Sequence, residues 1–204
     1  MAIKELTIGS NNPAKIDEWK KLLGSDVRIK GIAELGDFPE PKETGSTFAE
    51  NAKLKARYYA LLTGSFVLAD DAGFEVDALG GEPGVKSRRI LPGNKEGTDR
   101  ECVDYVLGRM KTVPKEKRGA QLVVHVALAD HKGKIIYEDN GRRVGYITEE
   151  SVNTIIPGYP YRSILYIPEV DKTYDKLTEK EYDKLNHRKK LAERLKKFLR
   201  TNRV

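Results

Sequence analysis

Two adjacent carboxylates close an apolar run in the stretch FVLADDAGF, which begins at Phe66. Side chains alternate between the two faces of a strand, so we expect Asp70 and Asp71 both to be buried only if the strand breaks there, which Gly73 permits. One carboxylate could then hold a divalent cation while the other faces a water molecule. Paired aspartates are also common on solvated loops, so the catalytic interpretation depends on the neighbouring motifs.

The turn SNNPAK offers a place for an anion. Asn12 and Pro13 are typical of the start of a helix, where free backbone N–H groups and the positive end of the helix dipole favour negative charge. Lys15 adds a formal positive charge in the first turn. The turn could therefore bind a phosphate group, although many helix caps bind nothing.

The segment ETGSTFAENAKLKA adds a carboxylate and two lysines. Glu43 precedes the expected helix, and Lys53 and Lys55 cannot share one helix face because they are two residues apart, so only one should reach the site. Glu43 with Asp70 and Asp71 would form an oxygen-only ligand set suited to Mg²⁺, and the lysine would suit its phosphate ligand.

Composition limits the class of protein. The chain has 204 residues, of which 39% are hydrophobic and 33% charged, as expected for one globular α/β domain over residues 1–204. The formal charge of +6 favours an anionic partner, either nucleic acid or a phosphorylated small molecule. The single cysteine, Cys102, the start MAIKELTIGS and the lack of a bilayer-length apolar stretch predict a cytoplasmic protein with no membrane partner.

Strand and helix signals alternate in the first half of the chain. The run ELTIGS predicts a strand, and the next segment places an apolar face on a helix through Ile16, Trp19, Leu22 and Leu23. A strand VRIKGI follows. The sequences from Thr47 and from Thr98 have the form of capping boxes and predict two further helices, the first ending at Gly64.

The second half is richer in β-structure. The runs AQLVVHVALAD, GKIIYED, RRVGYI and RSILYIP predict four strands, the first two joined by a turn at residues 131–133. The terminal run HRKKLAERLKKFLR predicts an amphipathic helix with Leu191, Leu195 and either Phe198 or Leu199 on its apolar face. Its basic face is typical of a solvated surface, which argues against nucleic-acid binding. The pattern predicts a mixed sheet with helices at both ends.

The motifs resemble those of the inosine triphosphate pyrophosphatase family, whose members hydrolyse non-standard purine nucleoside triphosphates to the monophosphate and pyrophosphate. The resemblance spans nearly the whole chain and is carried by SNNPAK, ETGSTFAENAKLKA, LADDAGFEVDALGGEPGVKSRR and the NHR at residues 186–188. It implies an elongated mixed β-sheet flanked by helices, with two lobes around a central nucleotide cleft, usually in a homodimer.

The resemblance also implies a role for each part of the site. Asp71 would be the general base that activates water for attack on the α-phosphorus, and Glu43, Asp70 and Asp71 would hold Mg²⁺. Phosphate binding would fall to Ser10, Asn12, Lys15 and Lys55. Base binding would fall to Tyr159, Tyr161, Arg162, Tyr182, His187 and Arg188, with Ala72 and Arg89 near the site.

The chain departs from the family where the base is recognised. The family's GFGYDP or GFGWDP loop reads GYPYRS here. Tyr159 can still stack on a purine, but Arg162 only donates hydrogen bonds where the family's aspartate accepts them. The other replacements are Tyr182 for a lysine, Asn186 for a serine and Ala72 for a serine. Either base selectivity has changed or the same purine pocket uses different polar partners.

Three functions follow from these observations. The first is Mg²⁺-dependent hydrolysis of ITP, dITP or XTP, which cleans the nucleotide pool. The second is the same chemistry on a different modified or standard nucleotide. The third, from another class, is a nucleotide- or nucleic-acid-binding protein with vestigial catalysis, and the carboxylates Glu43, Asp70 and Asp71 argue against it.

Overall fold

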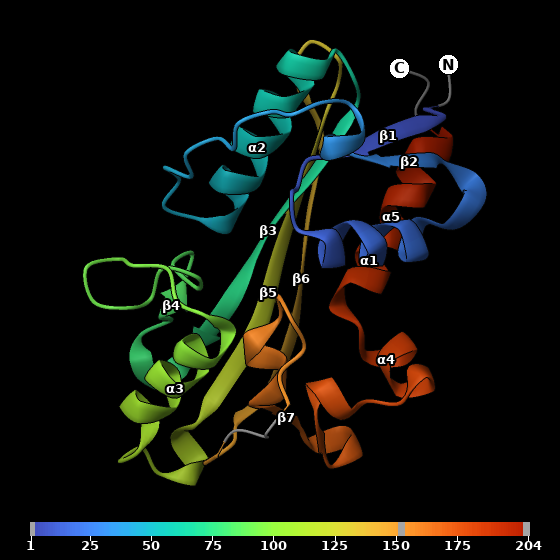
Figure 1. Cartoon of the computed structure of the whole chain (residues 1–204). Coiled ribbons are helices and arrows are strands. Elements are labelled where there is room, and N and C mark those ends of the chain that lie inside the picture. Colours follow the sequence, from blue (N-terminus) through green and yellow to red (C-terminus); the bar gives the residue numbers. More distant parts are fainter. Residues whose placement is uncertain (1–2, 151–153, 202–204) are drawn as a thin grey trace. The chain divides into compact units, whose positions relative to one another are not determined.

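The fold is organised around one mixed β-sheet (Figure 1). The computed structural model describes residues 3–150 and 154–201. The strand order is β2-β1-β3-β5-β6-β7-β8, and β4 pairs with β3. The strands are β1 Glu5–Ile8, β2 Arg28–Gly31, β3 Val67–Val76, β4 Pro83–Gly84, β5 Gly119–Ala129, β6 Ile135–Ile147, β7 Leu165–Ile167 and β8 Lys172–Thr173. The helices are α1 Pro13–Leu23, α2 Phe48–Thr63, α3 Asp99–Met110, α4 Glu179–Leu185 and α5 His187–Thr201. The predicted α/β class with a mixed sheet is confirmed.

The chain divides into two compact units. The first comprises Met1–Asp71, Val124–Gly141 and His187–Val204, and the second comprises Ala72–Val123 and Arg142–Asn186. Strands β3, β5 and β6 contribute residues to both units. No helix in the described part of the chain is long and apolar enough to cross a membrane.

The first unit contains three strands in parallel, β1, β2 and the start of β3, and helices whose ends follow the sequence signals. Strand β1 pairs in parallel with β2 and with β3. The Asn12 side chain accepts a hydrogen bond from the Ala14 N–H at the start of α1, as predicted. Helix α2 begins with the Thr47 capping box and ends at Gly64, whose φ of 62° suits glycine.

Helix α5 buries the apolar face that its spacing predicts. Leu191, Leu195 and Leu199 are buried, so Leu199 rather than Phe198 completes the stripe. The Phe198 ring packs on Tyr137 with 4.8 Å between centroids. The helix contacts α1, so the two helices cover the same part of the first unit.

Strand β3 is longer than predicted, which corrects the expectation of a break at Asp70. The strand continues to Val76, and Asp70 and Asp71 are only 1% and 7% exposed within it. Both can be buried because elements of the first unit cover both faces of the strand: α1 and α5 supply contacts to Asp70, and α2 supplies them to Asp71. Gly73 is therefore not needed to turn the chain.

Strand β6 corrects a second expectation, because GKIIYED and RRVGYI belong to one strand. Asn140 and Gly141 separate these two runs in the sequence. The structure uses Gly141 for close packing: a Cβ at this position would lie 2.8 Å from the His187 carbonyl oxygen. The start of helix α5 lies against the strand backbone there. Gly141 is therefore required for this close contact, and the strand continues through it without turning.

The second unit has its own apolar core. Helix α3 begins at the predicted Thr98 capping box and buries Cys102, Val103 and Met110. These side chains belong to a cluster that includes Phe74 and Tyr161, whose rings stack with 4.8 Å between centroids. The core is thus built from segments distant in sequence.

Candidate active site

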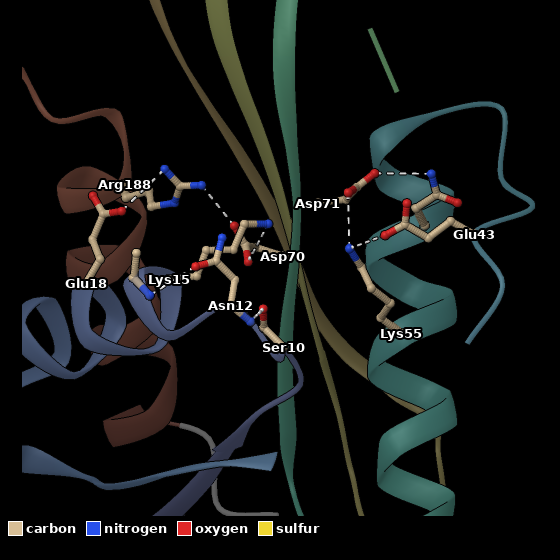
Figure 2. Close-up of polar contacts among 11 residues, drawn as sticks. Ser10, Asn12, Lys15, Glu18, Glu43, Lys55, Asp70, Asp71 and Arg188 are labelled. Carbon is tan, nitrogen blue, oxygen red and sulfur yellow. Dashed lines mark hydrogen bonds and ion pairs between the residues drawn. The ribbon is translucent and has the colours of Figure 1, made fainter. Parts of the chain in front are cut away.

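The two adjacent aspartates lie on opposite faces of β3, as Figure 2 shows. This follows from the alternation of side chains along a continuous strand. Each carboxylate meets a separate group of charged and polar residues, and both groups belong to the first unit. The two groups differ in composition, burial and electrostatics.

The Asp71 group contains three side chains from α2 and the loop before it. The Lys55 ammonium lies 3.1 Å from Asp71 Oδ1 and 2.9 Å from Glu43 Oε1. Lys53 instead pairs with Glu138 at 3.2 Å. One lysine therefore reaches the site, as the two-residue spacing predicts, and Lys55 is the one.

Asn51 completes this group and was not among the predicted site residues. Its Nδ2 donates to Asp71 Oδ2 at 3.1 Å, and its Oδ1 accepts from the Gly45 N–H at 2.8 Å. A signal for it was present in the sequence, because Asn51 and Lys55 are four residues apart and share one helix face.

Electrostatics in the Asp71 group favour a carboxylate that can take up a proton. Burial raises the pKa of Asp71 above its usual value, although the Lys55 ammonium opposes this effect. Burial alone would lower the pKa of Lys55, but the carboxylates Asp71 and Glu43 outweigh it and raise that pKa. Lys55 thus stays charged between its two partners.

The Asp70 group is a buried set of ion pairs between α1, β3 and α5. Arg188 NH2 donates to Asp70 Oδ2 at 3.0 Å, and Lys15 Nζ lies 3.5 Å from Asp70 Oδ1. Arg188 NH1 also lies 3.6 Å from Glu18 Oε2. Glu18, like Asn51, was not predicted, although it shares a face of α1 with Lys15 by its three-residue spacing.

Charge compensation dominates the Asp70 group. Burial would raise the pKa of Asp70, but Lys15 and Arg188 outweigh it and lower the pKa to about 2. Burial also lowers the pKa of Lys15, against the attraction of Asp70. Asp70 is therefore ionised at any pH near neutrality.

Three of the four predicted phosphate-binding residues, Ser10, Asn12 and Lys15, lie together at the start of α1, whereas Lys55 lies on α2. Ser10 Oγ accepts from the Asn12 N–H at 3.2 Å, and Asn12 Oδ1 accepts from the Ala14 N–H at 3.0 Å. These contacts shape the turn after β1, and Lys15 follows in the first turn of the helix (Figure 2). The turn has the backbone and charge that anion binding requires.

The carboxylates fit the implied Mg²⁺ in part. Glu43 and Asp71 both approach one cation, Lys55, so their oxygens already surround a position that favours positive charge. Magnesium commonly uses one or two carboxylates together with substrate phosphates, which these two residues can satisfy. Asp70 lies with its own cations. Among the described residues no three His, Cys, Asp or Glu side chains form a metal-binding group.

The predicted base-binding residues fall in both units. Tyr159, Arg162 and Tyr182 lie in the second, where the Arg162 guanidinium carbon is 3.6 Å from the Tyr159 ring centroid and 5.6 Å from that of Tyr182. The Tyr174 ring, 5.4 Å away, joins them. Arg162 is only 6% exposed and is thus held among aromatic rings.

The remaining predicted residues have varied settings. Tyr161 is a buried core residue whose hydroxyl donates to the Ser87 carbonyl oxygen. Ala72 follows Asp71 in β3, and Arg89 is half-buried in the second unit. His187 and Arg188 are buried at the start of α5 in the first unit. Arg188 was predicted to bind the base, whereas its contacts here are with Asp70 and Glu18.

The chain is similar to known proteins over nearly its whole length. A model of the Ham1 family matches residues 6–198. The dITP/XTP pyrophosphatase of Bacillus subtilis is 37% identical over 202 residues, which cover 97% of this chain and 98% of that protein. The dITP/XTP pyrophosphatase of Pseudomonas aeruginosa is 34% identical, with 97% and 98% covered.

Solved structures give the same result. The Ham1 protein of Staphylococcus aureus has a TM-score of 0.81 at 34% identity, covering 97% of this chain and 98% of that chain. A HAM1 protein from Coxiella burnetii has a TM-score of 0.82 at 31% identity, covering 98% and 100%. With its ordered motifs, its mixed sheet and these likenesses over nearly its whole length, the chain belongs to the Ham1 family.

Proposed function

We propose that this protein is a nucleoside triphosphate pyrophosphohydrolase that acts on non-standard purine nucleotides such as dITP and XTP. The names of its relatives support the reaction class. The observation that carries the proposal is Asp71, a buried carboxylate with a donor on each oxygen and with Glu43 and Lys55 beside it. We further propose that the whole chain, 1–204, acts as one catalytic domain.

In the proposed reaction Asp71 takes a proton from a water molecule as that water attacks the α-phosphorus. A new P–O bond forms to the water oxygen, and the bond between the α-phosphorus and the bridging oxygen breaks, which releases pyrophosphate and the monophosphate. Lys15, Lys55 and the turn formed by Ser10 and Asn12 hold the triphosphate and offset its negative charge.

The proposal includes Mg²⁺ held by Glu43 and Asp71. When bound, the ion would supply positive charge to the phosphate oxygens. The contacts of Asp70 with Lys15 and Arg188 favour a different role for this third predicted ligand, which is to hold the phosphate-binding lysine in place.

A second candidate, the same hydrolysis with altered base selectivity, is favoured by Arg162. Its guanidinium is held against Tyr159 and near Tyr174 and Tyr182. Such a group can only donate hydrogen bonds, so it favours a base edge that presents carbonyl oxygens. Xanthine, which has two carbonyl groups, should benefit most.

The proposed setting is the cytoplasm, with a homodimer as the resemblance implies. The single, buried Cys102 suits a reducing compartment. The proposal assigns the basic face of α5 to a solvated surface and not to a nucleic-acid-binding site.

The test is pyrophosphate release in the presence of Mg²⁺ from ITP, dITP, XTP and each standard nucleoside triphosphate. We expect turnover of ITP, dITP and XTP well above that of the standard nucleotides, and no turnover in EDTA. Turnover confined to another nucleotide would support altered selectivity. Nucleotide binding that weakens steeply with salt, without turnover of any member of the panel, would instead support the binding-protein alternative.

Arg162→Ala tests whether Arg162 takes part in base selection. If Arg162 reads carbonyl oxygens, the variant should lose turnover of XTP more than that of ITP, since xanthine offers one more acceptor. Arg109→Ala, a change at an exposed arginine of the same unit that pairs with Glu82, is the matched control. Equal losses for both nucleotides would remove Arg162 from base selection.

A further inference from the structure

We propose that Asn51 is a positioning residue for the Asp71 carboxylate, and that it fixes the Glu43 loop to that carboxylate at the same time. The inference rests on the proposed function, in which Asp71 takes a proton from water. Asn51 makes no proposed contact with substrate. Its role is to hold the orientation of the group that does.

The first observation is that Asp71 is held at both oxygens from one helix. Asn51 Nδ2 lies 3.1 Å from Oδ2, and Lys55 Nζ lies 3.1 Å from Oδ1. Rotation of the carboxylate would break one of these two contacts. A carboxylate has about four lone-pair directions, so about two remain for other partners. Asn51 thereby determines which directions of Asp71 stay open to water.

The second observation is that Asn51 is buried and uses both ends of its amide. It is 1% exposed, so an amide group without a hydrogen-bond partner there would be destabilising. Its Oδ1 accepts from the Gly45 N–H at 2.8 Å. This contact also fixes which end of the amide faces Asp71, because only the NH₂ group can donate to a carboxylate.

The third observation is the close approach of the loop that carries Glu43. A Cβ on Gly45 would lie 2.6 Å from Asn51 Oδ1 and 2.7 Å from Glu50 Cβ. Glycine is therefore required for the loop backbone to reach Asn51. Glu43, two residues earlier, contacts Lys55 on the same helix. Asn51 and Lys55 together connect the loop, α2 and Asp71.

A neutral amide suits this role. Lys55 already supplies one positive charge to Asp71, and Lys15 also attracts it. A donor without charge restrains the second oxygen and leaves the net charge of the group unchanged. Geometry rather than charge is thus the property that Asn51 contributes.

The variant Asn51→Asp separates the two contacts. Aspartate keeps an oxygen for the Gly45 N–H but has no donor for Asp71 when ionised. We would assay XTP and dITP turnover with Mg²⁺ in alkaline buffer, which favours the ionised form of the introduced carboxyl group. The expected result is a fall in kcat of about tenfold or more, with KM within about twofold and the folded protein intact by thermal melting.

Two further variants complete the design. Asn140→Asp makes the same chemical change at an exposed position of β6, and it should leave kcat and KM unchanged. Asn51→Ser keeps a hydroxyl near the loop but is too short to reach Asp71. It replaces Asn51→Asp in the test if that variant does not fold, and the same fall in kcat is expected.

The outcomes are distinct. A kcat within about twofold of wild type, or a loss confined to KM, would overturn the proposal and leave Asn51 as a residue that only holds the loop. Asp71→Asn is measured in parallel. If that variant keeps wild-type turnover, the proposed function of Asp71 fails, whatever the result at Asn51.

Discussion

Asp70 and Asp71 are neighbours in sequence but have opposite environments. Asp70 lies against two cations, Lys15 and Arg188, and its pKa is lowered to about 2. Asp71 lies against one cation and one neutral amide, and burial raises its pKa. The first carboxylate is thus kept ionised as part of a buried ion-pair group, and the second is able to accept a proton.

The comparison shows how one strand can supply two different carboxylates at consecutive positions. Alternation sends the side chains to opposite faces, and the helices on each face decide what each side chain meets. Buried ion pairs contribute little net stability but are costly to break, whereas a base must remain able to exchange its proton. We therefore expect substitutions of the two residues to differ in what they damage.

Asp71→Asn should have the largest effect. Without the proposed base, kcat should fall by about 10²–10⁴-fold. The amide is isosteric, and Lys55 keeps its contact with Glu43, so the free energy of unfolding should change by no more than about 1 kcal/mol. Pyrophosphate release and urea unfolding of the same samples measure the two quantities. A large loss of stability with intact turnover would reverse the assignment.

Asp70→Asn should damage stability instead. It leaves Lys15 and Arg188 buried without their shared carboxylate, which should lower the free energy of unfolding by about 3–5 kcal/mol. Urea unfolding measures this loss. Asp104→Asn, at an exposed ion pair with Arg100, is a control that should lower the free energy of unfolding by less than about 1 kcal/mol. Equal losses of unfolding free energy in the two variants would show that burial of the Asp70 ion pairs does not make them more costly to break.

Acid should also distinguish the aspartates. The pKa of Asp70 is about 2 in the folded protein and about 3.9 in an unfolded chain, so folding favours its ionised form. Its contribution is complete above about pH 4 and is lost as the pH falls towards 2, with a total of about 2–3 kcal/mol. Asp71 has the opposite sign, because its raised pKa means that folding favours its protonated form.

Urea titrations at a series of pH values measure this dependence. We expect Asp70→Asn to flatten the loss of stability between about pH 4 and 2, and Asp71→Asn to leave that loss in place. A wild-type profile retained in Asp70→Asn would assign the acid sensitivity to other carboxyl groups.

The two lysines of α2 give the smallest predicted difference. Lys55→Met leaves Glu43 and Asp71 without their shared cation and should lower the free energy of unfolding by about 1–2 kcal/mol. Since a divalent cation can replace the missing charge, Mg²⁺ should raise the melting temperature of this variant more than that of wild type. Lys53→Met loses only the ion pair with Glu138 at the surface. Its free energy of unfolding should stay within about 0.5 kcal/mol of the wild-type value. An equal response of both variants to Mg²⁺ would show that the ion does not replace the charge of Lys55 between Glu43 and Asp71.

Local signals were sufficient to predict several helix ends, although α4 was not predicted. Asn12, Thr47 and Thr98 begin helices as expected, and Gly64 ends one, because caps act through hydrogen bonds between residues a few positions apart. The apolar spacing of α5 was equally informative, although it left Phe198 and Leu199 unresolved. The same spacing argument predicted that a single lysine of α2 would reach the site.

Two predictions, a break in the strand near Gly73 and a division of residues 133–147 into two strands, were wrong because packing against other elements decided the outcome. Gly73 lies within a continuous β3, and Gly141 lies within a continuous β6 where α5 approaches closely. Glycine marks either a turn or a close contact, and the sequence alone does not distinguish them. Asn51 and Glu18 were missed for a related reason, since a polar residue on a helix shows its partner only when the other element is in place.

The sequence by itself determined the inventory of the site: the carboxylates, lysines and capped helix starts, their order, and the family that shares them. Only the tertiary structure decided which carboxylate meets which cation. Lys55 is 16 residues from Asp71, whereas Arg188 is 118 residues from Asp70. The physical reason is that caps and periodicity depend on neighbours along the chain, while burial and charge pairing depend on elements brought together by folding.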